Sequence, residues 1–137
     1  MTQQVIFKMN EEDFGMDIMM VKEILRMQSL TAMPNTTSYV LGVTNIRGQV
    51  VPIISLKNIL KMEEVEDNEN TRIIVVGSGE KIYGFKVDAV SEIIKIDEEE
   101  IEEPGKMNVD EEKNFIMGIA KLGERLVKLV DLEKILQ

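Results

Sequence analysis

The sequence contains no cysteine and no histidine, and these two absences exclude several kinds of chemistry. Without cysteine there is no disulfide, no thiol nucleophile and no thiolate ligand for a metal ion. Without histidine there is no Ser-His-Asp arrangement, most zinc sites are excluded, and the commonest general base is missing. The sequence also shows no glycine-rich phosphate loop and no metal-ligand spacing, so we expect no catalytic residue, no cofactor and no metal site.

Long apolar runs and a positive charge balance are missing too. No run approaches the ~20 apolar residues that span a bilayer. Residues 1–4 are not a basic segment that leads into an apolar stretch, so we expect no signal peptide and a cytoplasmic location. The net charge of −9 argues against nucleic acid or an anionic membrane surface as a partner. The 137 residues, 44% of them apolar, suffice for one soluble globular domain or for two very small lobes.

Much of the negative charge lies in two runs, at residues 63–67 and 97–103. Carboxylate runs can bind Ca²⁺, but such a site needs ligands at defined spacing around a glycine turn, and neither run has that spacing. We therefore interpret both runs as solvated loops or helix starts.

The most informative stretch covers residues 40–56. Residues 40–46 and 50–54 are apolar and rich in β-branched side chains, as strands are. Asn45 and Gly48, near the junction of the two runs, are turn formers. The pattern predicts a β-hairpin whose tip presents Arg47. Two interpretations of this arginine stay open: a solvated turn residue, or a guanidinium that binds a carboxylate or carbonyl group of a partner.

The chain repeats itself. Residues 14–24 recur 69 residues later as residues 83–93, with the shared pattern aromatic-Gly-x-x-apolar-x-x-Val-x-Glu-Ile. Residues 39–60 recur 76 residues later as residues 115–136, so the second copy carries seven extra residues within 97–114. Further elements of the first copy are expected as strands at 4–9, 14–18 and 24–28, helical segments at 19–23 and 56–62, and an acidic linker at 63–71.

A repeat of this kind predicts two similar β lobes within one domain, lobe 1 at about residues 10–66 and lobe 2 at about residues 67–137. Each lobe would have about five short strands, and a sheet this short hides its edges best by closing into a small barrel. Because each lobe is marginal by itself, the lobes should pack on each other and leave a groove. Two alternatives stay open: strands are exchanged between the lobes, or the similarity is a chance coincidence of strand patterns.

Residues kept in both copies are interpreted as structural, and residues found in one copy as candidates for function. The glycine pairs Gly15/Gly84 and Gly42/Gly118 belong to the structural group. The ten methionines allow two interpretations, the filling of an irregular core and an adaptable apolar surface for a partner helix. Five of them cluster in the first copy: Met16, Met19, Met20, Met27 and Met33.

Two kinds of charged residue occupy ambiguous positions in the repeat. Glu23 and Glu92 correspond, and a carboxylate kept in both copies could cap or pair within each lobe. Arg47 has no counterpart of its own kind at the same offset, although Arg125 lies nearby. This difference strengthens the functional interpretation of Arg47.

Four motifs together make the chain similar to the CheW-like family, the scaffold proteins of bacterial chemotaxis. The similarity covers nearly the whole chain, and the motifs are distinctive together although none is so alone. They are Phe14-Gly15-x-x-Ile18-x-x-Val21-x-Glu23-Ile24, Gly42-Val43-x-Asn45-Ile46-Arg47-Gly48-x-Val50-Val51-Pro52, Val87-Asp88-x-Val90-Ser91-Glu92, and Gly118 to Leu132 with Asp131-Leu132.

The resemblance implies a mainly β fold of two intertwined five-stranded SH3-like barrels, with short helices and a C-terminal helix. It implies a non-enzymatic adaptor that links the cytoplasmic tips of chemoreceptors to the regulatory domain of a sensor histidine kinase, which is itself similar to this family. No kinase core or receiver domain accompanies the motifs, so we expect a stand-alone coupling protein, peripheral to receptor arrays.

The resemblance also implies which residues bind partners. Receptor helices are expected in the groove between the lobes, lined by Ile18, Val21, Val87 and Val90. Glu23, Arg47 and Val50 also match family positions that are tied to partner binding. Asn45, a neighbour of Arg47 on the hairpin, is a further candidate for partner binding.

The chain departs from the family pattern at Ser55, where the family commonly has aspartate, as the second copy does at Asp131. If that carboxylate caps the following helix, serine can replace it. Two alternatives to the adaptor stay open: a CheW-like module in a signalling array outside chemotaxis, and an enzyme that uses Glu23 and Glu92 as acid/base groups.

Overall fold

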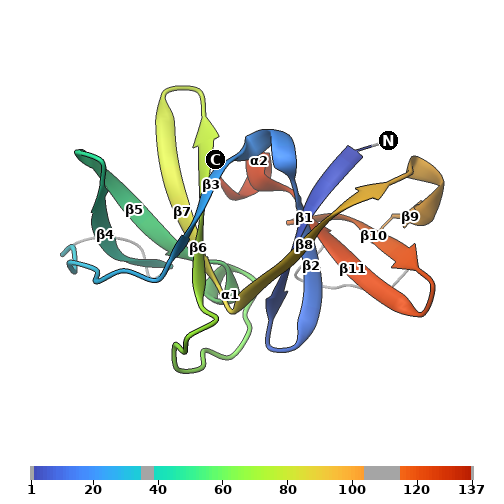
Figure 1. Cartoon of the computed structure of the whole chain (residues 1–137), viewed down its shortest axis with the longest axis horizontal. Helices are drawn as coiled ribbons and strands as arrows, with labels where there is room; N and C mark the ends of the chain where they lie inside the picture. The colour runs from blue at the N-terminus through green and yellow to red at the C-terminus, as the bar shows by residue number, and fades with distance from the viewer. Residues whose placement is uncertain (1, 35–38, 104–114, 137) are drawn as a thin grey trace. The chain divides into compact units, whose positions relative to one another are not determined.

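The computed structural model describes residues 2–34, 39–103 and 115–136, and its strands form two sheets (Figure 1). The first sheet has six strands in the order β8 (Ala89–Ile96), β1 (Thr2–Met9), β2 (Glu12–Asp17), β11 (Arg125–Val130), β10 (Ile116–Leu122) and β9 (Ile101–Glu102). The second has five in the order β3 (Val21–Arg26), β6 (Arg72–Ser78), β7 (Lys81–Val87), β5 (Gln49–Ser55) and β4 (Val40–Ile46). The prediction of a mainly β fold with two small sheets is confirmed.

The helical segments are short. They are η1 (Ile18–Met20), α1 (Leu56–Ile59), η2 (Glu98–Glu100) and α2 (Leu132–Ile135). The helical turn expected at 19–23 is η1, and β3 begins directly after it, three residues earlier than predicted. Within the described ranges, no helix is long and apolar enough to cross a membrane.

The chain divides into two compact units, which we call the terminal unit (Met1–Met19 and Val90–Gln137) and the central unit (Met20–Ala89). These units differ from lobes drawn at 10–66 and 67–137. The reason is strand pairing: β1 and β2 of the first copy pair with strands of the second copy, and β6 and β7 of the second copy pair with strands of the first. Each sheet is therefore assembled from both copies of the repeat.

Strand register follows the repeat closely. In the central unit, Gly84 of β7 pairs with Val75 of β6 and with Ile53 of β5. Gly15 of β2 holds the same position in the terminal unit between β1 and β11, at the registers that the offsets of 69 and 76 require. In the terminal unit β2 runs antiparallel to β1 and parallel to β11, and in the central unit β7 runs antiparallel to β6 and parallel to β5. The two units thus have the same sheet core.

Each unit has an apolar core of its own, built in part at corresponding positions. The core of the terminal unit contains Ile6, Ile96, Ala120, Val127 and Leu129. The core of the central unit contains Ile46, Val51, Ile53, Ile73 and Val75. The methionines have both of the expected environments. Met16 is fully buried and Met27 packs on the central core, whereas Met19 is 86% exposed.

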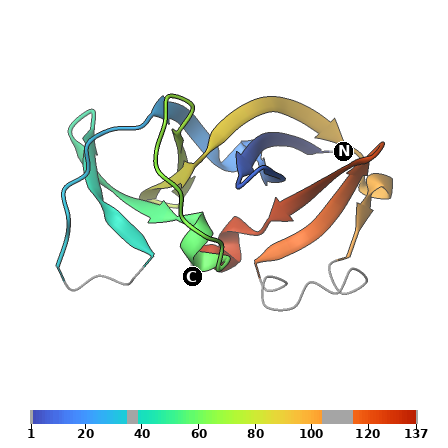
Figure 2. The same ribbon diagram turned by 90° about the horizontal axis from the view of Figure 1, so that it is seen from below.

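The predicted hairpin joins β4 and β5 through a two-residue turn. Arg47 and Gly48 form the turn with φ angles of 48° and 85°, the signs of a type I′ turn, which matches the twist of the flanking strands. Asn45 Oδ1 accepts a hydrogen bond from Gly48 N at 2.8 Å, which closes the turn. The segment after β3 runs along the other edge of β4 (Figure 2). Thr31 of this segment pairs with Val43 of β4.

The N-cap of α1 explains why serine is tolerated at position 55. Ser55 Oγ accepts a hydrogen bond from Asn58 N at 3.1 Å. At the corresponding helix in the terminal unit, Asp131 Oδ1 accepts from Lys134 N at 3.2 Å. A hydroxyl and a carboxylate therefore perform the same capping role, as expected for these residue types.

Candidate functional site

The hairpin tip and an edge strand of the central unit form the candidate site. Arg47 makes a two-pronged ion pair with Glu23 of β3: Nη1 donates to Oε2 at 3.0 Å, and Nη2 donates to Oε1. Because β3 and β4 are the two outermost strands of their sheet, this pair links the two edges. The structure therefore brings together two residues that lie 24 positions apart. Each was a candidate from the sequence, but no contact between them was predicted.

Exposure separates the two partners of this pair. The Arg47 side chain is 72% exposed, and the Glu23 side chain is 23% exposed. Val50, two residues beyond the turn and opposite Asn45 in the strand register, is 69% exposed, which is high for a large apolar side chain. Arginine, carboxylate and an exposed valine thus lie on one small region of the central unit.

The electrostatics of this region keep the arginine charged. The Glu23 carboxylate, which accepts its hydrogen bonds and attracts its charge, raises the pKa of Arg47. A guanidinium has five N–H donors, and Glu23 engages two of them, so three remain for acceptors on another molecule. An exposed, oriented guanidinium of this kind suits recognition of a carboxylate or a main-chain carbonyl group.

The four residues expected to line a groove belong to different units. Ile18 and Val90 lie in the terminal unit, whereas Val21 and Val87 lie in the central unit. Val87 is 1% exposed and is therefore a packing residue in this structure. The other three are half-buried.

A second arginine–glutamate pair lies in the terminal unit. Arg125 Nη1 donates to Glu92 Oε1 at 2.7 Å, and Arg125 Nε donates to Asp13 Oδ2 at 2.9 Å. Glu92 is the repeat counterpart of Glu23, so both carboxylates pair with an arginine within their own unit, one of the two roles expected for them. Arg125 lies two positions beyond the counterpart of Arg47 and reaches the equivalent carboxylate from there.

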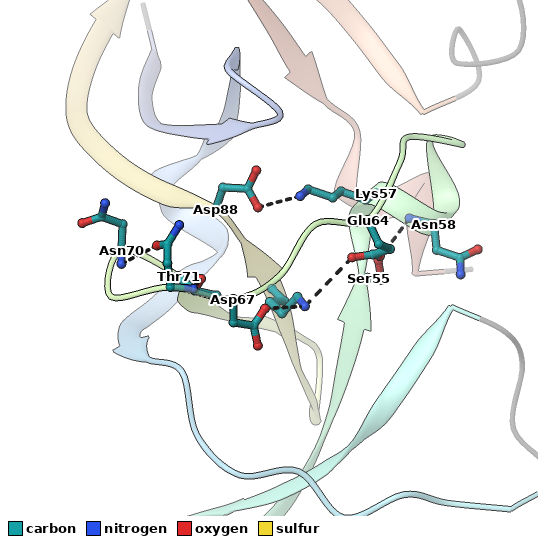
Figure 3. Close-up of polar contacts among 10 residues, drawn as sticks. Ser55, Lys57, Asn58, Glu64, Asp67, Asn70, Thr71 and Asp88 are labelled. Atoms are coloured by element: carbon teal, nitrogen blue, oxygen red, sulfur yellow. Dashed lines mark hydrogen bonds and ion pairs between the residues drawn. The ribbon is translucent and has the colours of Figure 1, made fainter.

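The acidic linker is fastened to the central unit by a polar network (Figure 3). Ser55 Oγ donates to a carboxylate oxygen of Glu64, and Lys86 Nζ donates to Asp67 Oδ1 at 2.8 Å. Beside this network, the buried ammonium of Lys57 pairs with Asp88 at 2.7 Å. Residues 63–70 therefore follow the surface of the central unit and do not leave it.

Sequence reasoning missed the partners of Arg125 and the Lys57–Asp88 pair. The signal for the first was present, because a glutamate kept at position 92 with an arginine on the neighbouring hairpin mirrors the first copy. No signal marked the second, since the counterparts of Lys57 and Asp88 in the repeat are Glu133 and Met19.

Comparison with known proteins agrees with this fold. The family profile of the CheW-like domain matches residues 3–137. The chemotaxis protein CheW of Klebsiella aerogenes is 37% identical over 132 residues, which cover 96% of this chain and 80% of that protein. The chemotaxis protein CheW of Helicobacter pylori is 34% identical over 98% of this chain and 81% of its own length.

A solved structure gives the same result in three dimensions. The crystal structure of the scaffolding protein TtCheW from Thermoanaerobacter tengcongensis matches with a TM-score of 0.87 at 34% identity, over 96% of this chain and 84% of that chain. Sequence motifs, the paired sheets and these likenesses all lead to one assignment: the chain belongs to the CheW-like family.

Proposed function

We propose that the chain is a non-enzymatic adaptor that couples the cytoplasmic tips of chemoreceptors to the regulatory domain of the chemotaxis sensor histidine kinase. It would work in the cytoplasm, peripheral to receptor arrays. Control of the kinase would arise from the geometry of assembly, with no bond made or broken. Family membership and the names of the relatives support this proposal.

The observation that carries the proposal is the surface around Arg47. Its guanidinium is held by Glu23, stands mostly in solvent, and lies near the exposed apolar side chain of Val50. Arginine beside an apolar anchor is typical of residues that dominate protein interfaces. A single small interface of this kind should bind with roughly micromolar affinity, about 8 kcal/mol, and array formation would add avidity.

The test is a calorimetric titration of the full chain with two separate ligands, a receptor-tip fragment and the kinase regulatory domain. Arg47→Glu should weaken binding of at least one ligand by roughly tenfold or more. The substitution replaces the guanidinium that would contact the partner with a second carboxylate beside Glu23. Lys95→Glu is the matched control, since it reverses an exposed charge on β8 of the terminal unit. Wild-type affinities for both ligands in the Arg47→Glu variant would refute the role of this surface.

A second variant examines the apolar candidate at the start of β3. Val21 is half-buried in the central unit, and Val21→Asp places a charge where an apolar partner would pack. We expect weaker binding of the receptor-tip fragment with a circular dichroism spectrum like that of the wild type. An unchanged titration with both ligands would remove Val21 from the proposed surface.

A further inference from the structure

The terminal unit contains a pocket of about 460 Å³ that the function proposed above does not use. It lies between the tip of the β1–β2 hairpin and the strands β10 and β11. Ile119, which is almost fully buried, and Leu126, which is 49% exposed, supply its apolar lining. Charged side chains, among them Glu11, complete the wall.

The charged side chains of the wall are already paired, with one exception. Glu12 pairs with Lys128 at 3.2 Å, and Asp13 pairs with Arg125 at 2.9 Å. Arg125 is further held by Glu92, as described above, so both cations of the wall have carboxylate partners. Glu11 has no ion pair or hydrogen bond to the side chains of residues 2–34, 39–103 and 115–136. The wall therefore carries one unmatched negative charge beside an apolar surface.

The repeat shows that this arrangement is particular to the terminal unit. Glu11 is the second residue of its turn and has φ 66°, directly after Asn10 with φ 50°. Its counterpart is Glu80, in the β6–β7 hairpin of the central unit, where Gly79 precedes it with φ 63°. Lys81 and Ile82 there replace Glu12 and Asp13, so the carboxylates that pair the wall cations have no equivalents.

We propose that this pocket binds one cationic side chain, an arginine or lysine on the surface of a protein partner. The aliphatic stem would lie against Ile119 and Leu126, and the charged end would meet the carboxylate of Glu11. An anion is disfavoured, because Arg125 and Lys128 would have to leave their carboxylates while Glu11 repelled the ligand. The proposal goes beyond the adaptor function, since it concerns the other unit and does not depend on which protein the partner is.

The test uses n-butylguanidinium, which carries the charge and the stem of arginine without a peptide. Titration into the ¹⁵N-labelled full chain should shift amide resonances of residues 11–13 and 125–128 and saturate at millimolar concentrations. Butan-1-ol, which has the stem alone, and butyrate, which has the opposite charge, should shift them far less. Shifts spread over all acidic surfaces of the chain, or an equal response to butyrate, would overturn the proposal.

Two variants identify the groups responsible. Glu11→Gln should weaken n-butylguanidinium binding about two- to fivefold, the range for one exposed ion pair. Glu80→Gln is the matched control, because it removes the same charge from the counterpart hairpin and should leave the titration unchanged. Leu126→Gln, which keeps every charge and removes apolar lining, should also weaken binding. Equal effects of Glu11→Gln and Glu80→Gln would show that binding depends on the net charge of the protein alone, and would refute the proposal that this pocket binds the cation.

Discussion

The two arginine–glutamate pairs of this chain occupy equivalent places in its two units and differ in how firmly they are held. Among residues 2–34, 39–103 and 115–136, Arg47 in the central unit pairs with Glu23 alone, and 72% of its side chain is exposed. Arg125 in the terminal unit has both Glu92 and Asp13, and 33% of its side chain is exposed. One arginine is therefore open to a partner, and the other is largely committed to its own unit.

A single position accounts for much of this difference. Asp13 supplies the second carboxylate in the terminal unit, whereas its counterpart in the central unit is Ile82, which packs against the apolar core. Turn geometry adds to it: Arg47 sits in the turn itself, at a position where the terminal unit has Gly123. One scaffold thus carries an exposed arginine in the turn of one copy and an arginine held by two carboxylates in the other.

The largest expected effect concerns the glycines of the parallel strand pairs. A Cβ on Gly84 would lie 2.6 Å from Ile53 Cδ1 and 2.8 Å from Ile73 Cγ2, whereas a Cβ on Gly15 would first meet Leu129 Cδ2 at 3.0 Å. Gly84→Ala should therefore lower the free energy of unfolding by about 2–3 kcal/mol, and Gly15→Ala by about 1 kcal/mol. Urea unfolding of both variants measures this, and equal losses would show that the two units are packed alike at this point.

A smaller effect on stability is expected from removal of Arg125, the arginine that is held by two carboxylates. Arg125→Met leaves Asp13, whose side chain is only 13% exposed, without its main hydrogen-bond donor. The loss should be about 1–2 kcal/mol in the free energy of unfolding, because a poorly solvated carboxylate loses its partner. Arg47→Met should cost clearly less, since its guanidinium is already in solvent. A larger loss for Arg47→Met than for Arg125→Met would reverse the comparison.

The smallest effect is a pH dependence of stability that arises from Asp13 in the terminal unit. The hydrogen bond from Arg125, more than any other contact, lowers the pKa of Asp13 from its usual 3.8. A carboxyl group with a lowered pKa stabilises the folded state fully above the unfolded value, and this contribution is lost as pH falls below about 3.8 through the folded value. The stability difference between the wild type and Asp13→Asn should therefore be constant above pH ~5 and shrink below pH ~4.

Unfolding curves at several acidic pH values test this, with Glu80→Gln as the control. Glu80 is exposed and lies on the counterpart hairpin of the central unit. A wild-type minus Asp13→Asn difference that stays constant down to pH 3 would mean that Asp13 does not titrate against Arg125 in the folded state.

Much of the fold was predictable because it depends on local sequence patterns and because these patterns occur twice in the chain. Hairpin turns, β-branched runs and glycines recur at offsets of 69 and 76, and the structure places each recurring glycine at the same register. The tip position of Arg47 followed from its own turn. Its pairing with Glu23 did not, because the two residues meet only when the edges of the sheet approach each other.

Other features could not be settled from the sequence for the same reason. The sequence left open whether strands are exchanged between lobes with bounds near residue 66, because two strand sets with nearly the same pattern can pair either way, and the structure shows the exchange. Val87 lies in a motif associated with binding, yet it is almost fully buried. The pocket beside Glu11 joins residues more than 100 positions apart.

The sequence by itself determined the strands, the hairpin tips and the two-copy pattern, since these depend on near neighbours and on periods of two residues. Only the tertiary structure decided which copy pairs with which and how the arginines differ. The physical reason is that backbone hydrogen bonds are alike for every strand. Which strands meet is therefore set by packing of the whole chain, and that packing places Asp13 beside Arg125 and Glu23 beside Arg47.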